Sequence, residues 1–174
     1  MNRVPMRSKA DLNEAGRAVF DEIMASRGQV DEAFQTLLPA PELLRRIAHL
    51  GTYIRFKSGL PAAVRECIIL ATARHMNSEY EWADHEPQAL AAGVSEDTIR
   101  SIRNGEPPHG YNVQEQAVVQ FVYEALRDRN VSDASFQRVE RHFGSAGVTE
   151  IAATIGFYSM LANILTVYNV GRSA

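Results

Sequence analysis

One segment of the sequence, residues 65–86, concentrates titratable and hydroxyl side chains; it reads RECIILATARHMNSEYEWADHE. Within it Ser78, Glu81 and His85 stand at positions i, i+3 and i+7, so a helix places their side chains on one face. Glu81 and His85 can touch at i, i+4, where a carboxylate stabilises an imidazolium. The spacing therefore predicts a carboxylate–imidazole pair that is suited to proton transfer.

Glu66 precedes these residues and is followed by apolar residues at i+3, i+4 and i+7. A lone carboxylate on an apolar helix face is costly unless it meets a partner. If the two predicted helices form a hairpin about the break near Asn77, Glu66 faces His85. Such a Glu–Glu–His cluster suits general acid–base chemistry, because burial and mutual contact tune the groups for proton transfer. From spacing alone a structural interpretation is also open, with Glu81–His85 a surface pair and Glu66 an ion-pair member.

Helix caps and apolar spacing along the rest of the chain predict an all-α protein. No stretch alternates apolar and polar residues for long enough to predict a strand. Residues 106–111, with two prolines, form the clearest predicted loop, and Pro87 is expected to kink or end its helix. The predicted helices begin at a capping box at Ser8–Asp11, at Pro41, behind Pro61, at Glu79, after Ser95, at Val113, after Ser132 and in the final uncharged segment, residues 151–170.

Length and charge exclude several classes of protein. The 174 residues point to one domain, with residues 8–38 as a helical N-terminal extension. The sequence has 18 Lys and Arg residues and 21 Asp and Glu residues, which gives a net charge of −3. This lacks the excess of basic residues that nucleic-acid-binding proteins carry, so we do not expect nucleic-acid binding. The 45% hydrophobic and 22% charged residues are typical of a soluble globular protein.

Cys67 is the only cysteine, so the chain has no internal disulfide, no CxxC redox pair and no cysteine-based zinc site. Residues 1–14 are charged and hold no apolar run of the kind found in export signals, which predicts a cytoplasmic protein. Residues 151–170 are uncharged and long enough to span a bilayer, but seven of them are polar. We therefore expect a helix buried in the protein or in a subunit interface, and no membrane association.

The spacing of four residues resembles the active-site pattern of the carboxymuconolactone decarboxylase and AhpD-like family. These residues are Glu66, Ser78, Glu81 and His85. In its AhpD-like peroxidase branch the pattern reads E-x11-C-x-x-C-x-x-x-H. Glu66 and His85 match the glutamate and the histidine, whereas Ser78 and Glu81 stand at the two cysteines. The resemblance is good over residues 43–92 and looser to about residue 170. It implies a single-domain, AhpD-like helical bundle.

The two missing cysteines decide which activity the resemblance implies. Without a dithiol the peroxidase role is not expected, and Cys67 points about 100° away from Glu66 around its helix, on an apolar stripe. The decarboxylase branch keeps E-x-x-x-H without the cysteine pair, as in Glu81–His85. The resemblance therefore implies an acid–base lyase or isomerase acting on a small organic acid or lactone. His85 would move the proton, and Glu66 and Glu81 would set its charge and orientation.

Further residues complete the prediction. Ser78, Tyr80 and Trp82 are candidate substrate-binding residues, and Arg65 and Arg74 are candidate partners of a substrate carboxylate. A metal site of His75, Glu81 and His85 is a weaker alternative. The resemblance itself implies no metal and no cofactor, and it implies homo-oligomers, commonly trimers or hexamers. A thiol-dependent peroxidase and a non-catalytic oligomeric binding protein are the alternative functions.

Overall fold

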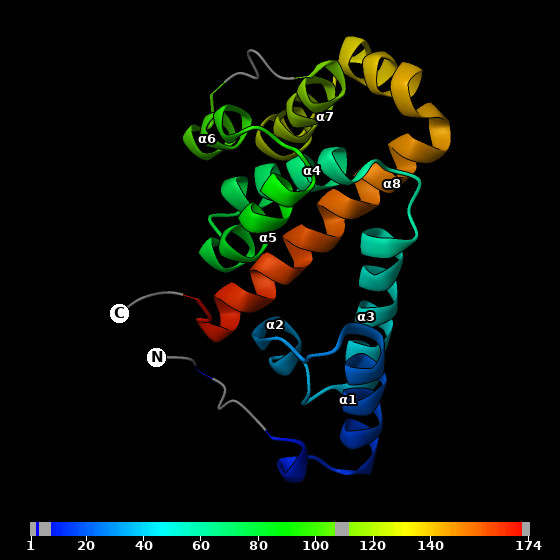
Figure 1. The fold of residues 1–174 in the computed structure, drawn as a ribbon, viewed down its shortest axis with the longest axis vertical. Helices are drawn as coiled ribbons and strands as arrows, with labels where there is room; N and C mark the ends of the chain where they lie inside the picture. Colours follow the sequence, from blue (N-terminus) through cyan, green and yellow to red (C-terminus); the bar gives the residue numbers. More distant parts are fainter. Residues whose placement is uncertain (1–2, 4–7, 107–111, 172–174) are drawn as a thin grey trace. The chain divides into compact units, whose positions relative to one another are not determined.

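The computed structural model describes residues 3, 8–106 and 112–171, and every regular element within these residues is helical (Figure 1). The all-α prediction is confirmed, whereas most of the predicted loop at residues 106–111 lies outside the described residues. The elements are η1 (Lys9–Asp11), α1 (Glu14–Arg27), α2 (Glu32–Gln35), α3 (Pro41–Phe56), α4 (Ala62–His75), α5 (Glu79–Ala91), α6 (Glu96–Asn104), α7 (Val113–Tyr123), η2 (Glu124–Asp128) and α8 (Asp133–Tyr168).

The chain divides into two compact units. The first unit consists of Met1–Lys57 and Ile164–Ala174, and it holds α1 to α3 and the end of α8. Ser58–Asn163 make up the second, which holds α4 to α7 and most of α8. All residues predicted to do chemistry belong to the second unit.

In the first unit α1 packs against α3. The capping box at Ser8 and Asp11 exists, but it closes only the single turn of η1, so the prediction that it begins the first long helix is wrong. Leu12 is extended and buried, and this interrupts the helix. The chain restarts at Asn13, whose side chain accepts the N–H of Gly16 and caps α1.

In the second unit α4 is the central helix, and α5, α6 and α7 pack around it (Figure 1). Nine of its fourteen residues are buried. A helix that is apolar almost all round requires neighbours on every side, and the order of the chain supplies them. Glu66 is the charged exception among the nine buried residues, and it lies where α5 approaches.

The hairpin between α4 and α5 turns at Asn77, which adopts a left-handed φ of 53°. Ser78 then precedes the first turn of α5. Pro87 leaves the carbonyl of Ala83 without its usual helical donor, yet α5 continues to Ala91. Pro87 is exposed, so water can reach this side of the helix, and the alternative in which the proline ends the helix is wrong.

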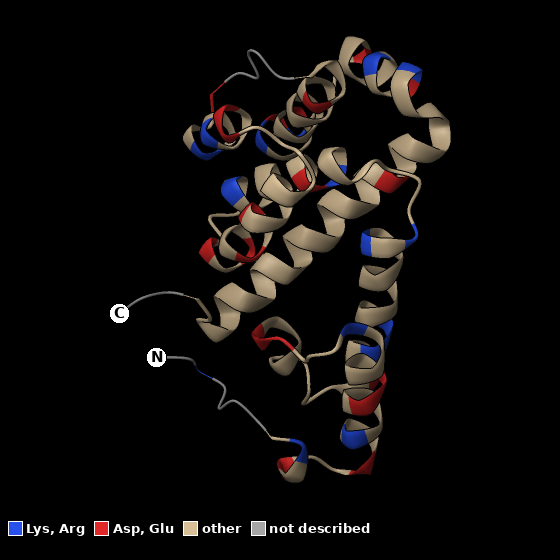
Figure 2. Cartoon of the chain, viewed as in Figure 1, with Lys and Arg blue, Asp and Glu red and all other residues tan. Residues whose placement is uncertain are grey.

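The helix predicted to begin at Val113 consists of α7 and the wider π-helical turn η2, which ends where Arg129 turns left-handed (φ 53°). α8 then bends at Gly144, whose φ of 67° and ψ of 176° are open essentially to glycine alone. The C-terminal part of α8 carries no charged residue (Figure 2). By length and composition α8 passes as a membrane span, and 44% of its most apolar window is buried inside the protein.

Candidate active site

Glu66 of α4 and His85 of α5 meet inside the second unit. Nδ1 of His85 lies 2.7 Å from Oε2 of Glu66, a hydrogen-bond distance. His85 is 1% exposed and Glu66 is 4% exposed, so the pair is shielded from water. The predicted helical hairpin therefore brings these two residues together, and the surface interpretation of His85 is wrong.

The other ring nitrogen of His85 faces two further carboxylates. Nε2 lies 3.8 Å from Oε2 of Glu81 and 3.6 Å from Oδ2 of Asp84. Both distances are too long for a direct hydrogen bond. When Nδ1 donates to Glu66, Nε2 is the nitrogen that can exchange a proton with another group. The carboxylate of Glu81 is buried in the protein interior, whereas that of Asp84 is half-exposed to solvent. Nε2 of His85 therefore lies near one buried and one solvent-accessible carboxylate.

Arg65 stands beside the pair. Its Nε lies 3.6 Å from the second oxygen of Glu66, and its side chain is 15% exposed. The sequence suggested Arg65 as a partner of a substrate carboxylate, whereas the geometry places it beside the acidic side chain of Glu66. Its positive charge offsets part of the cost of burying the Glu66 carboxylate.

Tyr158 of α8 covers the imidazole and was not predicted as a site residue. The ring centroids of Tyr158 and His85 are 5.0 Å apart at an interplanar angle of 88°, an edge-to-face contact. Phe157 packs edge-on against Tyr158 in turn, at 5.3 Å. The available signal was a tyrosine within the uncharged helix. Asp84 was also missed as a site residue, although it adjoins His85 in the sequence.

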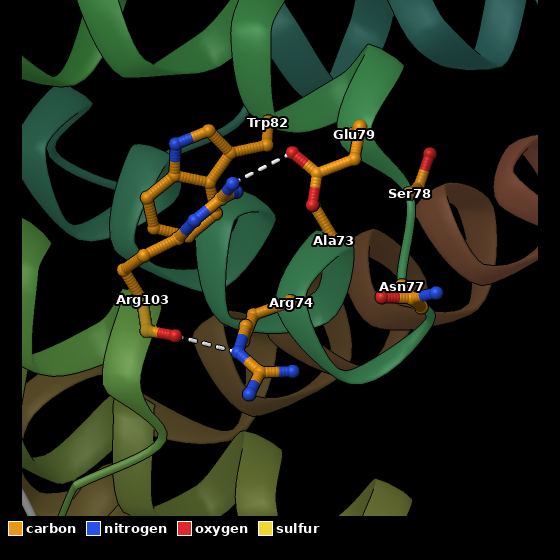
Figure 3. A pocket seen from close by; sticks show the side chains of 7 residues that line it. All are labelled: Ala73, Arg74, Asn77, Ser78, Glu79, Trp82 and Arg103. Carbon is orange, nitrogen blue, oxygen red and sulfur yellow. Dashed lines mark hydrogen bonds and ion pairs between the residues drawn. The ribbon is translucent and has the colours of Figure 1, made fainter. Parts of the chain in front are cut away.

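The predicted substrate-binding residues do not all share one cavity. Ser78 and Trp82 line a pocket of about 260 Å³ (Figure 3). Tyr80 is half-buried and is not one of its seven lining residues. Glu66, Glu81 and His85 do not line it either. The tertiary structure thus separates this pocket from the glutamate–histidine cluster, although both use α4 and α5.

Cys67 is fully buried, as its place on the apolar stripe predicts. Burial raises the pKa of its thiol far above the ordinary value, and the nearby carboxylates of Glu115 and Glu66 raise it further. The thiolate is the nucleophilic form of cysteine, so this residue is not suited to reduce a peroxide.

Among the described residues, no group of three or more His, Cys, Asp or Glu side chains could hold a metal ion. The alternative metal site of His75, Glu81 and His85 is therefore not assembled. His75 is exposed at the end of α4. Partial burial lowers its pKa first, and the positive charges of Arg127, Arg129 and Arg74 lower it further.

The model of the carboxymuconolactone decarboxylase family matches residues 41–124 of the chain. This range contains all six predicted site residues. No curated protein matches the sequence.

Several solved structures have the same fold. A peroxidase-related protein with an AhpD core from Ralstonia eutropha JMP134 has 19% sequence identity and a TM-score of 0.81, over 99% of this chain and 92% of its own. The debrominase Bmp8 has 16% identity and a TM-score of 0.77 over the same shares. A variant of Bmp8 in complex with 2,3,4-tribromopyrrole has 17% identity and a TM-score of 0.76, over 99% of this chain and 91% of its own. At these identities the likeness establishes the fold alone.

Proposed function

Because this chain belongs to the carboxymuconolactone decarboxylase and AhpD-like family but lacks the cysteine pair of the peroxidase branch, we propose that it catalyses an acid–base reaction. The proposed reaction is a decarboxylation or a related lyase or isomerase step on a small organic acid or lactone. The observation that carries the proposal is the buried 2.7 Å contact between Glu66 and His85. A carboxylate that holds one ring nitrogen orients the other for proton transfer.

In a decarboxylation the bond between the substrate carbon and its carboxylate breaks and CO2 leaves. The electron pair enters the conjugated carbonyl as a dienolate, which needs a hydrogen-bond donor while it forms. Nε2–H of His85 is the proposed donor, and it then transfers its proton to the carbon. The imidazole regains a proton from water, and Glu66 keeps Nδ1 protonated and the ring in place throughout.

Glu81 and Asp84 act on the same nitrogen of His85 in this proposal. Their carboxylates lie 3.8 Å and 3.6 Å from Nε2 and stabilise the imidazolium before the proton is transferred. Tyr158 limits rotation of the ring from the α8 side. We assign Glu66 and Glu81 as positioning residues and His85 as the catalytic residue.

We further propose that the protein is a cytoplasmic homo-oligomer, a trimer or a hexamer, that needs no cofactor. The support is the long α8, on which Phe136 and Val167 remain 40% and 60% exposed in the single chain. Apolar side chains on a long helix are candidates for burial against further copies. Light scattering behind size exclusion tests this, and a monomer at micromolar concentration contradicts it.

Turnover of a panel of lactones and unsaturated carboxylic acids, followed by absorbance and CO2 release, tests the catalytic proposal. We expect His85→Gln to lower kcat by roughly 100-fold or more, the usual contribution of a general acid or base. His49→Gln is the matched control, because His49 is exposed on α3, and its kcat should equal that of the wild type. An unchanged rate in His85→Gln overturns the assignment.

The alternative of a non-catalytic binding protein gives a different result in the same panel. It predicts thermal stabilisation by some ligands without turnover of any of them. Peroxide consumption that disappears in Cys67→Ser would instead support the thiol-dependent peroxidase.

A further inference from the structure

The pocket at the start of α5 is built mainly from polar side chains of α4, α5, α6 and the turn between α4 and α5 (Figure 3). Its volume of about 260 Å³ corresponds to roughly nine water molecules at about 30 Å³ each. A small molecule with one charged group fits such a space. The lining residues are Ala73, Arg74, Asn77, Ser78, Glu79, Trp82 and Arg103.

One arginine of the pocket is already engaged. Arg103 donates to Glu79 at 2.7 Å, and its guanidinium lies over the ring of Trp82, 4.7 Å from the centroid. The ion pair balances the charge of Arg103, and the stacking fixes its position. Arg103 thus forms a wall of the pocket, and its positive charge is already paired with Glu79.

Arg74 is the arginine of the pocket that has no ion-pair partner among the described residues. Its Nε donates to the backbone carbonyl of Arg103 at 2.6 Å, which fixes the plane of the guanidinium. Within the described part of the chain, its two terminal nitrogens have no hydrogen-bond or ion-pair partner. The lining therefore has two positive charges and one negative charge, a net charge of +1.

The surroundings of Arg74 are also positive. The neighbouring His75 is close enough to Arg127, Arg129 and Arg74 for all three to lower the pKa of its imidazole, in addition to the effect of burial. This clustering occurs in a protein with a net charge of −3. A local positive potential on an acidic protein attracts anions to that place.

We propose that this pocket binds a small organic anion through its carboxylate, with the terminal nitrogens of Arg74 as the bidentate donor. A guanidinium fork matches the geometry of a carboxylate. Asn77 and Ser78 also line the pocket, and the amide and the hydroxyl are further donors there. Among the described lining residues one guanidinium is without an ion pair and the net charge is +1, and this favours a monocarboxylate over phosphate. Because neither Glu66 nor His85 lines the pocket, the site is independent of the proposed catalysis.

The NMR titration of His75, assigned with His75→Gln, measures binding without any assay of activity. Benzoate is the probe, benzamide its neutral counterpart and inorganic phosphate the competing oxyanion. We expect saturable binding of benzoate that raises the pKa of His75, because an added negative charge offsets the neighbouring arginines. Benzamide should not bind.

Arg74→Gln should weaken the binding of benzoate by roughly ten- to a hundredfold, the effect of losing charge-assisted hydrogen bonds. Arg100→Gln is the matched control, because Arg100 lies on α6 one turn before Arg103 and does not line this pocket. It should leave the affinity unchanged. Equal binding of benzamide, tighter binding of phosphate, no saturation, or wild-type affinity in Arg74→Gln would each overturn the proposal.

Discussion

The imidazole of His85 and the carboxylate of Glu66 form a buried pair across the α4–α5 hairpin, with Nδ1 and Oε2 at 2.7 Å. The two residues lie on different helices, and each is at least 95% buried. Removing one member of such a pair leaves the other without its partner in the protein interior. The pair is therefore important for stability as well as for the proposed chemistry.

Glu66→Ala should lower the free energy of unfolding by roughly 3 kcal/mol, because it leaves His85 buried without its acceptor. Glu66→Gln keeps an acceptor oxygen and should lose clearly less. Glu79→Ala is the matched control, since it breaks an exposed pair with Arg103 and should cost about 1 kcal/mol at most. Urea denaturation measures all three variants. Equal losses in Glu66→Ala and Glu79→Ala would contradict a structural role of the buried pair.

Glu115 should make the protein less stable as the pH rises. Burial raises the pKa of this carboxyl, although the backbone N–H of Asn112 partly opposes the shift. A folded-state pKa above the unfolded value means that ionisation costs stability, so the loss grows from the unfolded pKa up to the folded one. Glu115→Gln keeps the acceptor and removes the charge, and it should be more stable than the wild type at pH 7. Unfolding free energies between pH 3.5 and 8 test this.

Glu124 supplies a control of opposite sign for that measurement. Burial of Glu124 opposes ionisation, but hydrogen bonds from Gln120 and from the N–H and hydroxyl of Ser132 outweigh it and lower the pKa. The stabilisation is present above the unfolded pKa and is lost as the pH falls through the folded one. Glu124→Gln should therefore be destabilised at pH 7. The same pH profile for both glutamine variants would refute this assignment of their environments.

Cys67 should be inert in the folded protein. Burial, with the carboxylates of Glu115 and Glu66, raises the pKa of its thiol, so the reactive thiolate is not available. We expect Ellman's reagent to label the protein only when urea unfolds it, and hydrogen peroxide to leave the thiol intact. Rapid labelling of the native protein would show that the site opens.

Gly144 should tolerate no side chain without strain. Its φ of 67° and ψ of 176° predict that Gly144→Ala lowers the unfolding free energy by roughly 1–3 kcal/mol. Gly156→Ala is the control on the same helix, because Gly156 has no positive φ and no atom within 4 Å of an added Cβ. It should gain about 0.5–1 kcal/mol. Thermal unfolding at one protein concentration compares them, and a neutral Gly144→Ala would show that the bend is not strained.

Local signals in the sequence predicted most of the helices and one long-range contact. Caps at Ser95 and Ser132 and the proline before α4 mark where helices begin. The apolar faces of α4 and the lone Glu66 predicted the hairpin partner His85, because a buried carboxylate needs a counterpart. The first helix was misplaced because Ser8 and Asp11 form a complete capping box on a single turn, and only the burial of Leu12 interrupts it.

By itself the sequence determined which chemistry is absent. One cysteine on an apolar stripe excludes a dithiol, and Ser78 and Glu81 occupy the two cysteine positions of the peroxidase-branch pattern that the sequence resembles. Such conclusions need only residue types and spacing along one helix. They hold in any arrangement of the remaining helices.

The tertiary structure decided which side chains share a space. Tyr158 reaches His85 from α8, and Arg103 reaches Trp82 and Glu79 from α6, across 73 and 21 to 24 residues of chain. These contacts depend on the rotation and packing of helices that no local pattern encodes. Packing also divides the predicted site, with Ser78 and Trp82 on the arginine-lined pocket and Glu66 and His85 on the buried pair.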